Sequence, residues 1–241
     1  MRWIAAIALV VGLAGLAFSD ERRAPGVRQA RSVGSPQDGR LLHGRRLRET
    51  PFIEILPHAA PRGRRFGTEE LVGVLTRAAG AVADKHPGST LRVADLSARG
   101  GGDVHMHASH ESGRDADVAF YLRDAGGADA RPPRFVKMIV GRSADGSLVF
   151  DAARNWTFVE ALVADRRTTV THVFVAEHLK ALLVAEARAA GARPGRIERA
   201  EAILTQPRGA FPHDNHFHIR VACAPEDRPE CVDGTRRSRR R

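Results

Sequence analysis

Aromatic residues and recognisable catalytic motifs are both scarce in this chain of 241 residues. Aromatics make up only 5% of the sequence, so we expect a core built mainly from Val, Leu, Ala and Ile. The sequence has no internal repeat, no His-Glu-x-x-His motif, no Ser-centred nucleophile elbow and no Gly-rich phosphate loop. The sequence therefore offers no alternative catalytic motif to the histidine pattern described below.

The overall composition is that of an ordinary globular protein. Hydrophobic residues account for 43% and charged residues for 27% of the chain, and the length suits one domain with appendages. The formal net charge of +10 favours encounters with partners that carry negative charge.

The one long apolar run lies at the N-terminus. Arg2 is followed by Trp3 to Phe18 without a charge, and Ala17 and Ser19 are the small residues that a signal peptidase requires. We therefore predict a signal peptide over residues 1–19, cleaved before Asp20, and an exported protein with no stable membrane anchor after cleavage. A retained anchor is the competing interpretation, but the run is shorter than the ~20 residues that span a bilayer. No cysteine lies near the predicted cleavage site, so the sequence gives no sign of lipidation.

Basic segments flank the middle of the chain. Residues 20–50 contain eight arginines against four acidic residues, with scattered Gly, Pro and Ser, so we predict a flexible basic arm. Residues 233–241 form a similar basic tail. Nucleic-acid binding is the alternative, but the arginines lack interleaved aromatics for base stacking, and export also speaks against it.

The two cysteines, Cys223 and Cys231, lie close together near the C-terminus. In an exported protein we expect them to form a local disulfide, with metal binding as the alternative. Such a bridge would fix the segment that follows the last predicted strand.

The expected elements alternate irregularly between helix and strand. Thr68 is a plausible N-cap for a helix with apolar residues at helical spacing, which ends at His86-Pro87-Gly88. Further strands are expected at 91–96, 115–120 (half-buried), 172–175 and 215–221, and further helices at 155–164 and 176–190. Because regular βαβ alternation is absent, we predict an α+β fold with a small, mainly antiparallel central sheet flanked by helices.

Two of the predicted strands carry polar residues at alternating positions. Asp115 and Asp117 point to one face of their strand, as do His216 and His218 on the last strand. If these strands are neighbours, the four side chains can meet at one point on the face of the sheet.

Histidines are concentrated around these positions. Five of the eleven lie in two short segments, whereas an isolated histidine is more often a surface or hydrogen-bonded residue. A zinc site of His110, Asp117 and His218 with water in the fourth position matches the three-ligand pattern of catalytic zinc. His216 could then act as general base or stabilise an oxyanion. The five histidines are His107, His110, His213, His216 and His218.

These segments resemble the penicillin-insensitive murein endopeptidase family of the lysostaphin and D-Ala-D-Ala metallopeptidase group. The resemblance runs from about Pro57 to Cys231 and rests on Asp95-Leu-Ser, the Gly-Gly loop, His107-Ala-Ser-His110, Gly113-Arg-Asp115-Ala-Asp117, Arg154-Asn-Trp156, Phe174-Val175 and His216-Phe-His218. It implies a periplasmic zinc enzyme that cuts D-Ala to diaminopimelate cross-links of peptidoglycan. The implied ligands are His110, Asp117 and His218, sometimes joined by His107, and the implied catalytic residues are His216 and His213.

Two positions depart from the family pattern. Glu111 replaces a usual Gln and could pair with Arg114 or alter the local field, and Met106 replaces a usual Gly or Pro. Asp115 could either orient a ligand or cap a loop.

We expect a zinc metallopeptidase domain over residues 51–232, with peptidoglycan and not nucleic acid as its partner. A D-Ala-D-Ala carboxypeptidase and a non-catalytic protein that binds the wall or a metal are the alternatives. Another divalent ion could replace zinc, and the oligomeric state stays open.

Overall fold

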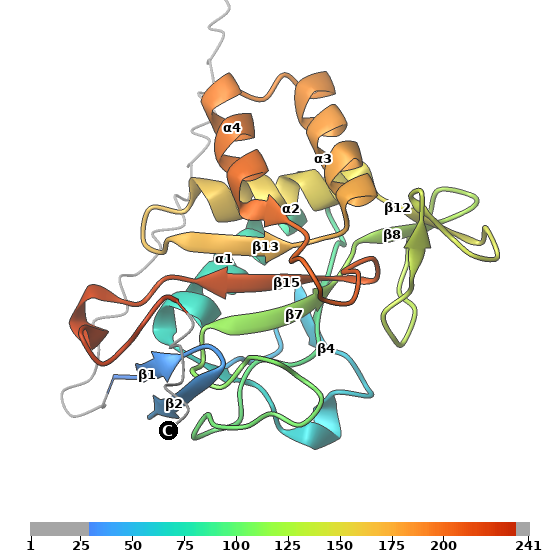
Figure 1. Cartoon of the computed structure of the whole chain (residues 1–241). Coiled ribbons are helices and arrows are strands. Elements are labelled where there is room, and N and C mark those ends of the chain that lie inside the picture. The colour runs from blue at the N-terminus through green and yellow to red at the C-terminus, as the bar shows by residue number, and fades with distance from the viewer. Residues whose placement is uncertain (1–28, 235–241) are drawn as a thin grey trace, which may run out of the picture.

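The protein is described from a computed structural model that covers residues 29–234 (Figure 1). The predicted signal peptide and the arginine-rich end of the predicted tail lie outside these residues. Within residues 29–234, no helix combines the length and the apolar character that crossing a membrane requires.

A six-stranded sheet forms the centre of the molecule, in the order β14-β13-β15-β7-β6-β4 (Figure 1). The β13/β14 and β4/β6 pairs are parallel, and the other three pairs are antiparallel. The predicted α+β class with a mainly antiparallel sheet is therefore confirmed. The strands are β4 Ile53–Ile55, β6 Leu91–Val93, β7 Asp115–Ala119, β13 Val170–Phe174, β14 Leu204–Thr205 and β15 His216–Val221.

Four α-helices accompany this sheet: α1 Glu69–Lys85, α2 Ala152–Ala164, α3 Glu177–Ala189 and α4 Pro194–Ile203. Thr68 caps α1 as predicted, with its side-chain oxygen accepting a hydrogen bond from the Leu71 amide. The α2 helix starts earlier than predicted because Asp151 caps it. The sequence analysis missed α4, which buries only Ile197 and Ala200 and so lacks a strong apolar period.

One face of the sheet packs against the helices. Val118 of β7 and Phe217 and Ile219 of β15 are fully buried there. They belong to the same apolar cluster as buried residues of α1, α2 and α3, and the ring of Phe217 contacts that of Phe120 at 4.7 Å. This layer is the hydrophobic core.

A second, smaller antiparallel sheet has the order β10-β11-β12-β8-β9 and lies to one side of the centre (Figure 1). Its strands are too short to show a period in the sequence, so none was predicted. They are β8 Leu122–Asp124, β9 Asp129–Ala130, β10 Met138–Ile139, β11 Arg142–Ser143 and β12 Leu148–Phe150. The connection between β9 and β10 carries Phe135, which reaches the candidate site described below.

The prediction of a flexible arm is wrong for residues 29–50. Strands β1 Arg31–Ser35 and β2 Asp38–Leu42 form a hairpin, and β3 Arg45–Arg46 pairs with β5 Phe66–Gly67. Leu41 and Leu47 are 1% exposed. The high arginine content concealed these two buried apolar anchors, so the folded domain begins well before residue 51.

The last described segment of the chain packs against this hairpin, where Gly34 donates to the Glu230 carbonyl and its own carbonyl accepts from Val232. The predicted disulfide between Cys223 and Cys231 is confirmed. The buried Arg114 side chain donates to the Val221 and Val232 carbonyls and to Asp233, so Asp233 packs on the domain and does not begin a free tail. Two short 3-10 helices, η1 Ala60–Arg62 and η2 Pro225–Asp227, complete the described elements.

Candidate metal centre

The pairing of β7 with β15 positions the predicted site residues. The register places His218 opposite Asp117, and Arg220 opposite Asp115, on one face of the sheet. All five residues of β7 are buried, so the half-buried prediction is wrong. The helices cover one face of β7, and the loop between β6 and β7, residues 94–114, contributes site residues on the other. We call this segment the histidine loop.

His110 is the most enclosed residue of the histidine loop, with no exposed surface. Its φ of 75° lies in the left-handed region, which a non-glycine residue seldom adopts. Its amide donates to Asp115 at 3.2 Å, its carbonyl accepts from Ser97, and its Nδ1 lies 3.0 Å from the Leu96 carbonyl. These contacts fix the ring with Nε2 facing Asp117.

The Asp117 carboxylate is the point on which four imidazoles converge. Its Oδ1 lies 3.3 Å from His110 Nε2, 3.1 Å from His218 Nδ1 and 3.5 Å from His216 Nε2. Its Oδ2 lies 3.5 Å from His107 Nδ1. Residues about a hundred positions apart in the sequence therefore meet, as the alternating pattern predicts.

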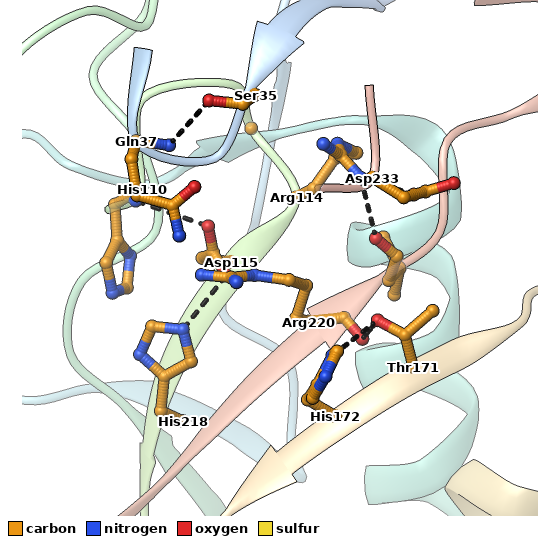
Figure 2. Close-up of polar contacts among 12 residues, drawn as sticks. Ser35, Gln37, His110, Arg114, Asp115, Thr171, His172, His218, Arg220 and Asp233 are labelled. Carbon is orange, nitrogen blue, oxygen red and sulfur yellow. Dashed lines mark hydrogen bonds and ion pairs between the residues drawn. The ribbon is translucent and has the colours of Figure 1, made fainter. Parts of the chain in front are cut away.

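All four rings have an acceptor at their outward nitrogen, which for His216 is Asn215 Oδ1. His218 Nε2 lies 2.9 Å from Asp115 Oδ1, as Figure 2 shows, and His107 Nε2 lies 3.0 Å from an oxygen of Asp95. For His110 the acceptor is the Leu96 carbonyl. A neutral imidazole that donates outward carries its lone pair on the inward nitrogen, where a metal ion could accept it.

The donor atoms fit a cation. Those of His107, His110 and Asp117 all lie within 4.8 Å of one another. Among the described residues, His110 Nε2 and Asp117 Oδ1 are buried without a hydrogen-bond partner, which costs free energy unless another group satisfies them. His218 Nδ1, on the paired strand β15, adds a fourth donor atom 3.1 Å from Asp117 Oδ1. Imidazoles with one carboxylate are donors that suit zinc and related divalent ions.

The electrostatics favour positive charge at this point. Burial opposes ionisation of Asp117, but its electrostatic interactions with His110 and His216 outweigh burial and hold the pKa of Asp117 well below its usual range. Burial likewise disfavours the charged form of His218, yet its hydrogen bond to Asp115 and the negative charges of Asp115 and Asp117 raise its pKa to about 9. Asp115 and Asp117 therefore stay ionised and stabilise positive charge on His218, and the same negative charge would favour a metal cation.

His216 and His213 form the more open side of the cluster. The side chain of His216 is 19% exposed, and its ring stacks on Phe135 with centroids 4.6 Å apart and planes at 8°. Its Nδ1 lies 2.5 Å from Asn215 Oδ1. The His213 ring lies 5.4 Å from that of His216, and burial together with the neighbouring histidines lowers the pKa of His213 to about 4.

Asp115 contacts both the backbone of the histidine loop and the ring of His218. It accepts from the His110 amide of the histidine loop and also holds His218, while Arg220 Nε donates to it at 2.6 Å (Figure 2). Glu111 does not pair with Arg114: its carboxylate accepts from the Gly39 amide of the β1–β2 hairpin at 3.1 Å. Hairpin residues thus support the histidine loop.

Sequence reasoning assigned no role to Asp95 or Phe135, although both contact histidines of the cluster. Asp95 is part of the Asp95-Leu-Ser segment on which the family resemblance rests, and that was the only sequence signal pointing to it. Phe135 lies in an irregular connection whose path no periodicity reveals.

Comparisons with known proteins show the family to which this chain belongs. The family model for penicillin-insensitive murein endopeptidase matches residues 33–239. Curated proteins of that name from Escherichia coli O1:K1 / APEC, strain SMS-3-5 / SECEC and O45:K1 strain S88 / ExPEC are each 27% identical over 239 residues, covering 95% of this chain and 80% of the relative. The chain belongs to the penicillin-insensitive murein endopeptidase family.

Proposed function

We propose that this protein is an exported, zinc-dependent D,D-endopeptidase that cleaves D-Ala to diaminopimelate cross-links of peptidoglycan in the periplasm. The convergence of four imidazoles on the Asp117 carboxylate is the observation that carries this proposal. Family membership supports peptidoglycan as the substrate.

The proposed ligands are His110, Asp117 and His218, with His107 as a further ligand from the histidine loop. A bound zinc ion would polarise the scissile carbonyl and activate water as the nucleophile at neutral pH. The enclosed environment of His110 and the hydrogen bond from His218 to Asp115 hold the donor atoms in place, so little rearrangement is needed when the metal binds.

His216 is the proposed general base. Its Nε2 faces the cluster, and its partial exposure leaves room for a substrate to approach. The stacked Phe135 ring limits rotation of the imidazole, so the nitrogen stays directed at the reacting groups. His213 stays neutral at physiological pH because of its lowered pKa, so we propose that it donates a hydrogen bond to the substrate and does not act as a cation.

The first test is incubation of the purified protein with cross-linked sacculi, with and without a chelator, followed by mass analysis of the products. We expect dimeric muropeptides to become monomers only without chelator. Trimming of pentapeptides with intact dimers would establish the carboxypeptidase alternative instead.

Two substitutions separate catalysis from metal binding. His110→Ala should lose bound zinc and all activity, whereas His216→Ala should keep zinc and lose at least ~100-fold in activity. His43→Asn is the control, because His43 is exposed and Asn tolerates its left-handed backbone. Full zinc content in His110→Ala would refute the ligand assignment, and full activity in His216→Ala would indicate a non-catalytic binder.

A further inference from the structure

A charged cluster lies directly behind His107, on the side away from Asp117. Its centre is Asp95, which is 3% exposed. Arg62 contacts both oxygens of this carboxylate, with Nε 3.0 Å from Oδ1 and Nη2 2.9 Å from Oδ2. Oδ2 is also 3.0 Å from His107 Nε2 and 3.5 Å from Arg64 Nη1. One buried carboxylate therefore joins a histidine of the metal centre to two arginines.

His107 needs such support more than the other histidines do. It follows Met106, which is 90% exposed and has a left-handed φ of 72°, and its own side chain is 22% exposed. His110, in contrast, is completely enclosed. A ring at the edge of a loop can adopt several rotamers, and only some of them direct Nδ1 toward Asp117.

We propose that Asp95 is a positioning residue that holds His107 in its metal-binding orientation, and that Arg62 and Arg64 hold Asp95. The inference rests on the proposed function only in placing His107 at the metal centre. A histidine that binds a metal through one nitrogen commonly donates its other N–H to a carboxylate, which is the arrangement of His107 between Asp117 and Asp95.

The contacts with Arg62 and Arg64 explain why the buried Asp95 carboxylate stays ionised. Burial alone would favour its neutral form, but hydrogen bonds from His107 and Arg62 outweigh this and keep the pKa of Asp95 below its ordinary value. Arg64 also donates to the His105 carbonyl at 3.2 Å. It thereby links the carboxylate to the backbone of the histidine loop two residues before His107.

The same design occurs on the other side of the metal centre. Asp115 accepts from His218 and is held by Arg220, just as Asp95 accepts from His107 and is held by Arg62. The first arrangement lies within the sheet and the second within loops. Strand pairing helps to hold His218 in place. His107 lies on a loop, so side-chain contacts must supply the corresponding rigidity.

Zinc affinity of the whole purified protein, measured by competition with a chromophoric chelator, tests this role. We expect Asp95→Asn to raise the zinc dissociation constant by about 10–100-fold. His107→Ala should raise it similarly, and adding Asp95→Asn to His107→Ala should change it no further. Asp165→Asn is the matched control, because Asp165 is another carboxylate paired with an arginine, Arg77, and no residue of the metal centre contacts it.

Arg62→Gln is a second variant that leaves Asp95 and His107 intact, so it tests the cluster even if Asp95→Asn fails to fold. We expect a smaller loss of zinc affinity with an unchanged unfolding midpoint. Wild-type zinc affinity in folded Asp95→Asn or Arg62→Gln, or additive effects of Asp95→Asn and His107→Ala, would overturn the inference. Retention of zinc by His110→Ala would instead overturn the metal centre itself, so the two failures are distinguishable.

Discussion

The two faces of the β7–β15 strand pair differ completely in chemistry although both are buried. One face contributes Ala116, Val118, Phe217 and Ile219 to the apolar core, and the other carries Asp115, Asp117, His218 and Arg220. Strand geometry produces this difference, because successive side chains point to opposite faces. A polar histidine and carboxylate cluster is thus built on the back of a hydrophobic core, and the core fixes the strands that position the polar side chains.

Asp115→Asn should have the largest effect, because it acts on the polar face in two ways. It leaves the buried Arg220 without its carboxylate, which should lower the free energy of unfolding by about 3–5 kcal/mol. It also weakens the orientation of His218, so zinc affinity should fall about 10–100-fold. Urea denaturation and chelator competition measure the two effects. An unchanged result in both would mean that Asp115 supports neither residue.

Phe217→Ala should affect only the core face. Removing a fully buried aromatic side chain should lower the free energy of unfolding by about 3–5 kcal/mol. Zinc affinity of the folded protein should stay near that of the wild type, since Phe217 points away from the ligands. Phe217→Leu, as a control, should cost less than about 1.5 kcal/mol. A large loss of zinc affinity in either variant would show that the two faces are not independent.

Removing the disulfide tests the support beyond the end of β15. The double substitution Cys223→Ala and Cys231→Ala should lower the free energy of unfolding by about 2 kcal/mol, because the closed loop is short. Zinc affinity should change little, since strand pairing holds His218 separately. Thermal unfolding under non-reducing conditions provides the measurement, and an unchanged midpoint would contradict a stabilising role.

Asp165→Asn should give the smallest effect, up to about 1 kcal/mol at neutral pH, because Arg77 is partly exposed. Burial raises the pKa of Asp165, but hydrogen bonds from Arg77 and nearby amides outweigh it and lower the pKa overall. A carboxyl group with a depressed folded-state pKa stabilises the protein above its unfolded pKa of about 3.9 and loses that contribution as the pH falls below it. The difference between wild type and variant in urea denaturation should therefore shrink from pH 7 to pH 3. A constant difference would point to another cause.

The sequence predicts the strand pair because alternation along a strand fixes which side chains share a face, and Asp117 and His218 therefore meet as expected. His110 joins them from the histidine loop, and only its place in the histidine-rich segment indicated this. The sequence cannot predict contacts made by irregular segments, such as those of Asp95 and Phe135, because loop paths depend on tertiary packing. The hairpin at residues 31–42 was missed for a related reason. It lies within an arginine-rich stretch of the chain, and its stability depends on partners elsewhere, including the Glu230 carbonyl that accepts from Gly34.

The position of β15 in the sheet has a consequence for how the protein matures. This strand is the last in the described chain, yet it lies between β13 and β7, which both precede it in the sequence. Until β15 arrives, those two earlier strands present open edges to any other polypeptide. A nascent or truncated chain without β15 thus lacks His216 and His218 and is prone to aggregation. The histidine cluster on Asp117 can therefore be completed only after β15 has been synthesised and has inserted between β13 and β7.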